Sequence, residues 1–262
     1  MEPPSFNPEV PSIARVYDYL LGGKDHFPAD REVGDIFIRQ FPGAVAIAMD
    51  NRACLTRAVD FIAAGLGIGQ FIDLGSGLPT ADNVHQVAQR ANPAARVAYV
   101  DNDPSVLAHG RALLAEDDQT IVVQADITSP QAVLGLPEVR ELLDLNRPVA
   151  VIASAILHHV TDAEDPVSLI TAVKEVVPAG SALFISHFRT LGDPDSAAME
   201  EVLQEAFGRG AWRTDAQIAE YFAGTDLLEP GIVPCAQWHP GKDPGELSGY
   251  QRLIVAGLAV KP

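Results

Sequence analysis

The chain has 262 residues, of which 47% are hydrophobic and 20% are charged, enough to bury the core of one large domain or two small ones. Its 35 acidic and 18 basic residues give a formal net charge of −17, which disfavours nucleic acid and anionic membrane surfaces as main partners. Cys54 and Cys235 have no metal-ligand spacing, so we expect reduced, packed thiols and a cytoplasmic protein.

The N-terminal quarter of the chain has helical patterns only. Its first residues carry neither the basic nor the apolar segment of a signal peptide, and no apolar run in the chain approaches the length that spans a bilayer. Helices are expected at 13–21, 29–39 and 52–64. We predict that residues 1–64 form a helical cap over the edge of a sheet built from residues 65–262.

From residue 65 short apolar runs alternate with helical patterns, which is typical of a mostly parallel sheet covered on both faces. Strands are expected at 70–74, 96–100, 121–124, 148–155 and 181–186. The helices between them are expected at 80–91, 104–115, 131–143 (interrupted near Pro137) and 166–177.

The alternation ends after this fifth strand. Two helices, 195–207 and 214–222, follow each other directly, and two extended segments at 228–238 and 253–260 have no helix between them. This order predicts an antiparallel hairpin at the edge of the sheet. Residues 191–231 hold nine acids and two arginines, which is typical of solvated helix faces.

The sharpest local motif is Asp73-Leu74-Gly75-Ser76-Gly77, between an expected strand and an expected helix. Gly75 and Gly77 allow the backbone to turn sharply and to approach a ligand closely. Pro79 follows and lacks an N–H donor, which weakens the interpretation of the motif as a pyrophosphate site.

Acidic residues also end the next two strands. Asp101, followed by Asn102, is placed to accept hydrogen bonds from two ribose hydroxyls. Asp126 can accept from an adenine amino group while Ile127 lies against the ring. Strand-end aspartates also begin turns or cap helices. Their presence at three successive strand ends favours a nucleoside-containing ligand.

These motifs, with Leu157-His158-His159 and Pro178-Ala179-Gly180-Ser181, resemble the motif series of class I S-adenosylmethionine-dependent methyltransferases. Residues 13–27, Asn51-Arg52, 77–80, 99–104 and 227–231 are similar to one bacterial family of such enzymes, so the resemblance covers about residues 12 to 260. It implies an α/β, Rossmann-like fold whose mostly parallel sheet has seven strands, one of them antiparallel. It also implies S-adenosylmethionine as cofactor, bound at the carboxyl edge of the sheet.

The cofactor contacts expected from this resemblance come from the strand ends: Asp73, Gly75, Ser76, Gly77, Asp101, Asn102, Asp126, Ile127 and Ala155. Arg52, expected at the start of a helix, offers a guanidinium fork for the methionyl carboxylate, and Asn51 could add a donor. A surface arginine paired with an acid is the alternative.

Residues 13–31 are expected to form a lid whose ordering depends on the cofactor. Gly22-Gly23 would be its hinge, and the groups toward the substrate would be Tyr17, Lys24, His26 and Phe27. A rigid helical appendage is the alternative.

His158 and His159 follow the fourth strand, where the methyl group should point. In an extended segment neighbouring side chains face opposite ways, so only one of them should reach the acceptor. We expect His158 to be the catalytic base, because imidazole titrates near neutral pH. The alternative is that both histidines pack and that alignment of the reactants is the whole mechanism.

Other site types are disfavoured. Gly22-Gly23-Lys24-Asp25 lacks the first glycine and the Ser/Thr of a phosphate-binding loop. The group of His158, His159, Asp162 and Asp165 does not complete a metal shell, so we expect no metal. Ser154 and Ser186 have no nucleophile-elbow context, which disfavours a hydrolase.

The function expected is therefore methyl transfer to the oxygen, nitrogen or carboxyl group of a small-molecule acceptor. A non-catalytic sensor or scaffold that binds S-adenosylmethionine is the main alternative. A nicotinamide oxidoreductase is a second, disfavoured by Leu78-Pro79. Equilibrium binding of the two cofactors separates the last class from the others. The sequence indicates no oligomeric state.

Overall fold

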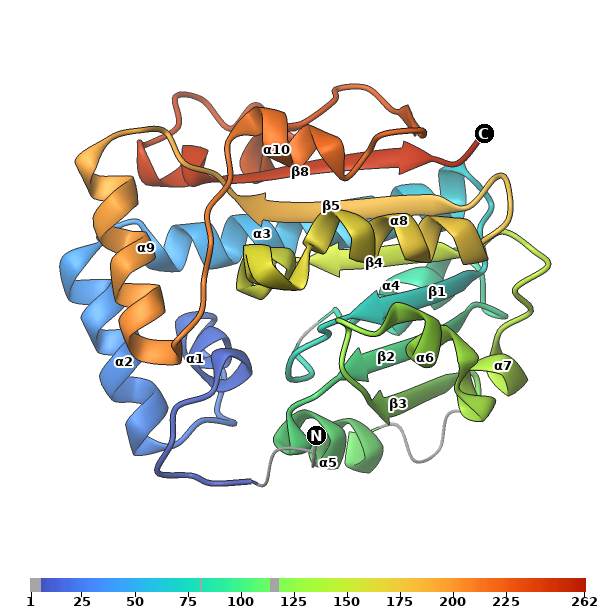
Figure 1. Ribbon diagram of the computed structural model, residues 1–262, viewed down its shortest axis with the longest axis horizontal. Coiled ribbons are helices and arrows are strands. Elements are labelled where there is room, and N and C mark those ends of the chain that lie inside the picture. Colours follow the sequence, from blue (N-terminus) through green and yellow to red (C-terminus); the bar gives the residue numbers. More distant parts are fainter. Residues whose placement is uncertain (1–5, 81, 114–117) are drawn as a thin grey trace.

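Within residues 6–80, 82–113 and 118–262, which the structure describes, the computed structural model centres on an eight-stranded sheet (Figure 1). The strand order is β3-β2-β1-β4-β5-β8-β6, with β7 also paired to β8, and β1 to β5 are parallel. β8 runs antiparallel to β5. The strands are β1 Gln70–Leu74, β2 Arg96–Asp101, β3 Thr120–Gln124, β4 Ala150–Ser154, β5 Ala182–Phe188, β6 Asp226–Leu227, β7 Val233–Pro234 and β8 Ile254–Val260.

This architecture confirms the expected Rossmann-like fold, and each of the five parallel strands lies within two residues of its predicted bounds. The sheet has eight strands because the segment before β8 pairs with it twice, as β6 and again as β7. Pro230 lies between these two short strands and Pro234 ends the second. Proline cannot donate to a ladder, so the predicted long strand at 228–238 is broken.

The helices follow the predicted order. Proline occupies the first turn of several of them, where its missing N–H would have no partner within the helix. Their bounds are α1 Ile13–Leu20, α2 Pro28–Gln40, α3 Ala44–Asp60, α4 Val84–Ala91, α5 Pro104–Leu113, α6 Pro130–Gly135, α7 Pro137–Leu142, α8 Pro166–Val176, α9 Pro194–Phe207 and α10 Asp215–Glu220. A π-helical turn, Phe61–Gly65, extends α3, and 3-10 turns span Leu157–His159, Asp162–Glu164, Cys235–Gln237 and Tyr250–Leu253. The predicted end of the second inter-strand helix, Ala115, lies outside the described residues.

The third helix corrects the prediction that a helix begins at Arg52. α3 begins at Ala44, so Arg52 lies in its middle. Ile47, Ala48 and Asn51 are already on the buried face of the helix, with the spacing of an amphipathic helix. Gly43 precedes α3 and makes no side-chain cap bond, which removes the usual sequence signal for a start.

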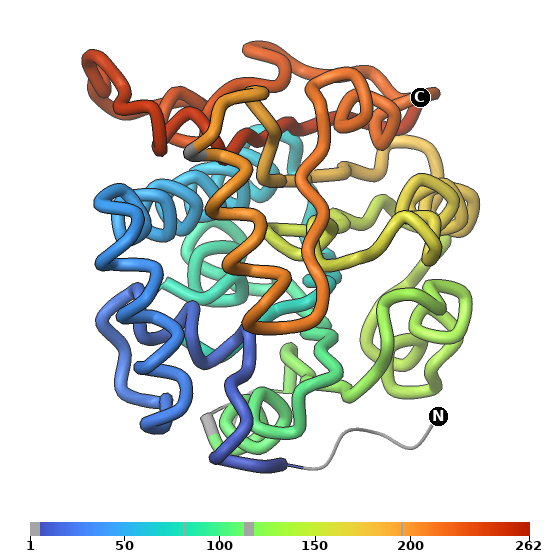
Figure 2. Tube along the Cα trace, turned by 60° about the vertical axis from the view of Figure 1, so that its left-hand side comes forward, coloured from blue at the N-terminus to red at the C-terminus, as the bar shows by residue number. Residues whose placement is uncertain are grey.

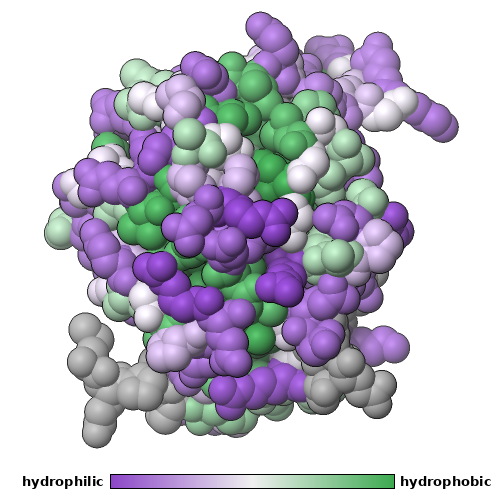
Figure 3. Space-filling view, turned by 90° about the vertical axis from the view of Figure 1, so that its right-hand side faces the viewer, coloured by the Kyte–Doolittle hydropathy of each residue, from purple (hydrophilic) through white to green (hydrophobic). Residues whose placement is uncertain are grey.

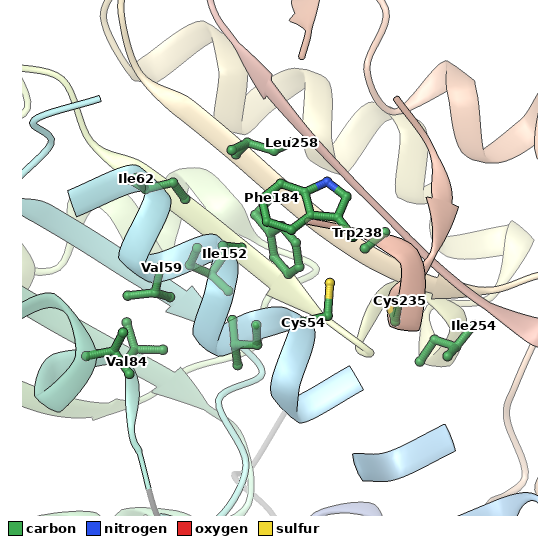
Figure 4. Packing of buried hydrophobic residues seen from close by; sticks show 14 of the residues in the cluster. Cys54, Val59, Ile62, Val84, Ile152, Phe184, Cys235, Trp238, Ile254 and Leu258 are labelled. Carbon is green, nitrogen blue, oxygen red and sulfur yellow. The ribbon is translucent and has the colours of Figure 1, made fainter. Parts of the chain in front are cut away.

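Helices cover both faces of the sheet. Cores on the two faces are built by α3, α4 and α5 on one side and by α6, α7, α8 and α10 on the other. On the α3 side Phe184 of β5 packs against Trp238, with ring centroids 6.0 Å apart, above Cys54 (Figure 4). None of the described helices is long and apolar enough to cross a bilayer.

α1 and α2 lie beyond the carboxyl ends of the parallel strands, next to α9 (Figures 1 and 2). They are joined by a buried ion pair between Arg15 Nε and Asp30 Oδ2 at 2.8 Å. Asp30 also accepts from the backbone N–H groups of Ser12 and Phe27. The first 64 residues thus serve two purposes, since α1 and α2 cap the strand ends whereas α3 covers a face of the sheet. On the opposite side, at the amino ends of the strands, hydrophilic and hydrophobic side chains are mixed (Figure 3).

Candidate functional site

A cavity of about 830 Å³ lies at the carboxyl edge of the parallel strands, between the strand ends, α1, α3 and α9. All of the residues predicted to bind the cofactor are among those that line it: Arg52, Asp73, Gly75, Ser76, Gly77, Asp101, Asn102, Asp126, Ile127 and Ala155. Because β1, β2 and β3 are neighbours, the loops that follow them form one end of the cavity, which we call the cofactor end.

The loop after β1 leaves its backbone open to the cavity. Gly75 and Gly77 have φ angles of +69° and +67°, a region that favours glycine. A Cβ at Gly75 would lie 2.2 Å from the Ile156 side chain, whereas a Cβ at Gly77 would meet no atom within 4 Å. Between them the Ser76 hydroxyl is buried and has no partner among the described residues. A ligand that bonds to this hydroxyl would remove the cost of its burial.

The loop after β2 is tied to the loop after β1. The Asp101 carboxylate accepts from the backbone N–H groups of Gly77 and Asp103, both at 2.9 Å. Burial raises the pKa of Asp101, while these backbone hydrogen bonds oppose the rise. Each carboxylate oxygen has two lone pairs, so Asp101 can still accept from a ligand hydroxyl.

Asp73, at the end of β1, is buried on the cavity wall. Desolvation raises its pKa to about 7, with the Arg52 guanidinium opposing the rise and the Asp101 charge adding to it. Arg52 reaches this region from the middle of α3, and its Nη2 donates to the Asp82 carbonyl at 2.9 Å. The cofactor end therefore combines acidic groups with the nearby guanidinium of Arg52.

A buried polar network connects the cap to the ends of β4 and β5. Asn51 Nδ2 donates to the Tyr17 hydroxyl at 2.9 Å, and Ser186 Oγ donates to Asn51 Oδ1 at 2.6 Å. Ser186 Oγ also accepts from the backbone N–H of Ala155, which has a φ of +53°. Burial raises the pKa of Tyr17 to about 12, so its hydroxyl stays protonated and donates to the Ala48 carbonyl. Both the nitrogen and the oxygen of the Asn51 amide are therefore hydrogen-bonded within the protein.

Of the four residues predicted to face the substrate, only Tyr17 lines the cavity. Lys24 is exposed, His26 Nδ1 lies 3.1 Å from Asp18 Oδ2, and Phe27 packs on the Phe6 ring. The expectation that Lys24 and His26 face the site is thus wrong. The reason is the turn after α1, where the Asp18 carboxylate accepts from Asp25 N–H and holds this segment against the cap.

His158 and His159 both line the cavity and are 2% and 5% exposed. They belong to a 3-10 turn, and their ring centroids are 4.3 Å apart, so the predicted extended segment with opposed side chains is wrong. Burial lowers the pKa of His158 well below its ordinary value and that of His159 to about 3. The two arguments that favoured His158 as a base, its direction and its near-neutral titration, therefore do not hold.

The sequence interpretation missed the contribution of α9. Its residues Met199, Leu203, Ala206 and Phe207 line the cavity, together with Arg209 and Trp212 just beyond the helix. The spacing i, i+4, i+7, i+8 indicated an apolar face, but not which surface it would cover. With His158, His159 and Phe188, these side chains form the end of the cavity on the β4–β5 side, which we call the acceptor end.

Comparison with known proteins identifies the family of this chain. The sequence matches the S-adenosyl methyltransferase family over residues 1–262. The chain belongs to this family. A crystal structure from Thermobifida fusca, provisionally described as a methyltransferase, is 44% identical, with a TM-score of 0.93 and coverage of 97% of this chain and 96% of that one. A DUF574 family protein from Streptomyces avermitilis is 38% identical, with a TM-score of 0.93 and coverage of 97% and 99%.

The same architecture extends to more distant methyltransferases. The N-methyltransferase NodS from Bradyrhizobium japonicum, solved with S-adenosyl-L-homocysteine, is 11% identical with a TM-score of 0.51, over 95% of this chain and 99% of that one. This likeness concerns the fold. No functionally curated protein matches the sequence. Family membership confirms the predicted enzyme class and cofactor, and it favours an enzyme over a non-catalytic sensor.

The cofactor end of this methyltransferase suits S-adenosylmethionine, which supplies an activated methyl group when bound. Gly77 leaves room beside the backbone, the Ser76 hydroxyl has no protein partner within the described part of the chain, and the Asp101 carboxylate lies at the end of β2. Among the described residues, no group of three or more His, Cys, Asp or Glu side chains could hold a metal ion.

Proposed function

We propose that this methyltransferase acts on a small-molecule acceptor, bound beside the cofactor in the cavity at the sheet edge. The observation that carries the proposal is the cavity itself, in which the three strand-end loops continue into a compartment walled by α9 and the cap. A compartment of this kind suits a small ligand. The net charge of −17 and the buried free thiols of Cys54 and Cys235 support a cytoplasmic enzyme whose substrate is not nucleic acid.

Within this proposal Asp101 and Asn102 hold the ribose, and Asp126 with Ile127 holds the adenine. Asp126 is exposed at the rim of the cavity, where its carboxylate caps the turn at Thr128. The methionyl portion would be held by the loop after β1 through the Ser76 hydroxyl, by Ala155 and by the Arg52 guanidinium. Asp73, near the end of β1, is buried and lines the cavity next to this loop.

The contribution of the protein to the reaction is alignment. The strand-end loops and α9 would hold the acceptor against the bound cofactor, which lowers the entropy cost of bringing the reactants together. The cap and α9 exclude water from this position. Such a mechanism does not require a strongly basic side chain, in agreement with the lowered pKa values of His158 and His159.

Titration calorimetry followed by a turnover assay tests the proposal. S-adenosylmethionine and S-adenosylhomocysteine are expected to bind, and a nicotinamide dinucleotide is not. A library of small hydroxyl, amine and carboxyl compounds should then yield S-adenosylhomocysteine above the rate without an acceptor. Cofactor binding without turnover on any of the small compounds, together with turnover on a nucleic acid or a protein, would reject a small-molecule acceptor.

Arg52→Lys is expected to weaken cofactor binding about tenfold, because a point charge cannot make the two parallel hydrogen bonds of a guanidinium to a carboxylate. Calorimetric titration with S-adenosylhomocysteine measures the loss. Arg31→Lys, at an exposed position on α2, is the matched control and should bind as the parent does. If Arg52→Lys also binds like the parent, another group holds the carboxylate.

Hydrogen exchange in residues 13–31 is expected to slow when S-adenosylhomocysteine is added. Tyr17 and Val16 line the cavity, so a ligand there adds contacts to α1 and suppresses its local opening. The segment 166–176 on the far face of the sheet is the internal reference and should keep its rate. Identical exchange of 13–31 in both states would mean that the cap is already rigid without ligand.

A further inference from the structure

The acceptor end has a different chemical character from the cofactor end. Among the described residues, the carboxylates that line the cavity are Asp73, Asp101, Asp103 and Asp126, all at the ends of β1, β2 and β3. The acceptor end has none of these, and its charged side chain is Arg209, whose Nη2 lies 2.9 Å from Glu164. An acceptor amine that arrives as an ammonium ion would find no carboxylate partner there.

Aromatic side chains shape this end. Trp212 stacks on Phe188 with an interplanar angle of 6° and ring centroids 4.7 Å apart. The His158 ring contacts Phe188 edge-on, with a centroid distance of 4.8 Å. Phe207 and Met199 complete the wall from α9. Aromatic rings and an adaptable thioether favour a flat, ring-bearing ligand.

Three buried nitrogen atoms on this wall have no hydrogen-bond partner among the described residues. They are Nδ1 of His158, Nδ1 of His159 and Nε1 of Trp212, on side chains that are 2%, 5% and 8% exposed. A buried polar atom without a partner is costly, and three on one cavity wall indicate a ligand with a polar group at this point. An indole N–H is always a donor, and a neutral imidazole can donate from one nitrogen.

We propose that the acceptor is an apolar, ring-bearing molecule with an acidic hydroxyl, such as a phenol, and that His158, His159 and Trp212 hydrogen-bond its oxygen. The inference rests on the proposed function and names the substrate class of that same site. The acidic hydroxyl loses its proton to bulk solvent before the acceptor enters the cavity. Its oxygen then forms a bond to the methyl carbon while the carbon–sulfur bond breaks, and the electron pair of that bond remains on sulfur. The products are a methyl ether and S-adenosylhomocysteine.

Binding of matched probes to the protein saturated with S-adenosylhomocysteine tests the acceptor class. The probes are 4-nitro-1-naphthol, titrated at the pH at which half of it is ionised, and 1-naphthylmethylamine, an ammonium of similar size at that pH. The naphthol is expected to bind at least tenfold more tightly, and its anion absorbance should rise on binding at constant pH. Equal or tighter binding of the amine, absence of naphthol binding, or an unchanged anion band would overturn the inference.

Two tryptophan variants localise the effect. Trp212→Phe keeps a ring on Phe188 but removes the N–H, so naphthol binding should weaken about tenfold. Trp238→Phe is the matched control, because Trp238 is also buried and its Nε1 has no hydrogen-bond partner in the described ranges, but it does not line the cavity. Equal losses in both variants, or none in Trp212→Phe, would overturn the role of Trp212.

The same titrations distinguish failure of the proposed function from failure of the acceptor class. If S-adenosylhomocysteine does not bind the parent protein, the proposed function fails and the acceptor class fails with it. If it binds but the naphthol is not preferred, only the acceptor class is rejected. The probe comparison uses the parent protein, so it remains decisive even if a variant does not fold.

Discussion

Asp101→Ala is expected to weaken S-adenosylmethionine binding by ten- to a hundredfold. A hydrogen bond to a charged carboxylate contributes about 1.5–3 kcal/mol, and each 1.4 kcal/mol corresponds to about tenfold in affinity. The substitution also releases the N–H groups of Gly77 and Asp103, which Asp101 holds at 2.9 Å. The loop that meets the cofactor would thereby lose its support as well as its ribose partner.

Titration calorimetry of a folded variant measures this loss. Asp144→Asn, at the opposite edge of the sheet beside Gln70, is the control and should bind normally. Asp126→Ala should lose less than Asp101→Ala, because only the adenine amino group is involved. An Asp101→Ala protein with native melting behaviour and unchanged affinity would remove Asp101 from the site.

The contribution of Asp73 to the stability of the cofactor-free protein is expected to fall as the pH rises from about 4 to about 7, and Asp73→Asn should abolish this dependence. The pKa of Asp73 is raised from 3.8 in the unfolded chain to about 7 by burial. In this window the unfolded state releases the proton while the folded state retains it, so rising pH favours unfolding. The free energy of unfolding that is lost through the ionisation of Asp73 is at most about 4 kcal/mol, and this loss no longer changes above pH 7.

Urea unfolding of both proteins at several pH values between 4 and 8 provides the measurement. The difference in unfolding free energy between Asp73→Asn and the parent should grow up to about pH 7 and then stay constant. Asp144→Asn is the control, since hydrogen bonds from Asn146 lower the pKa of Asp144 and place its titration below this window. Parallel stability curves for Asp73→Asn and the parent would show that Asp73 ionises normally.

The strands and the cofactor end could be predicted because their signals are local. An apolar run such as 70–74 followed by Gly75-Ser76-Gly77 fixes both a buried strand and a sharp turn. Parallel pairing then brings Asp101 and Asp126 to the same edge without further information. Family membership supports this part of the interpretation.

The acceptor end could not be predicted because it depends on tertiary contacts. The acids of α9 indicated a solvated helix, and its apolar face did not reveal that it would cover a cavity. His158 and His159 follow a strand, but a 3-10 turn brings their rings together. The turn after α1 directs Lys24 outward through the Asp18 carboxylate, an interaction between residues with no periodic pattern.

The continuity of the two ends within one cavity makes the enzyme a target for bisubstrate inhibitors. Adenosine joined by a short thioether linker to a naphthol would fill both ends at once. The linker converts the second binding event into an intramolecular one, with an effective concentration in the millimolar range. The adenosine half would engage strand-end loops of a fold that other methyltransferases share. The naphthol half, against Trp212 and α9, would therefore carry the selectivity of such a compound.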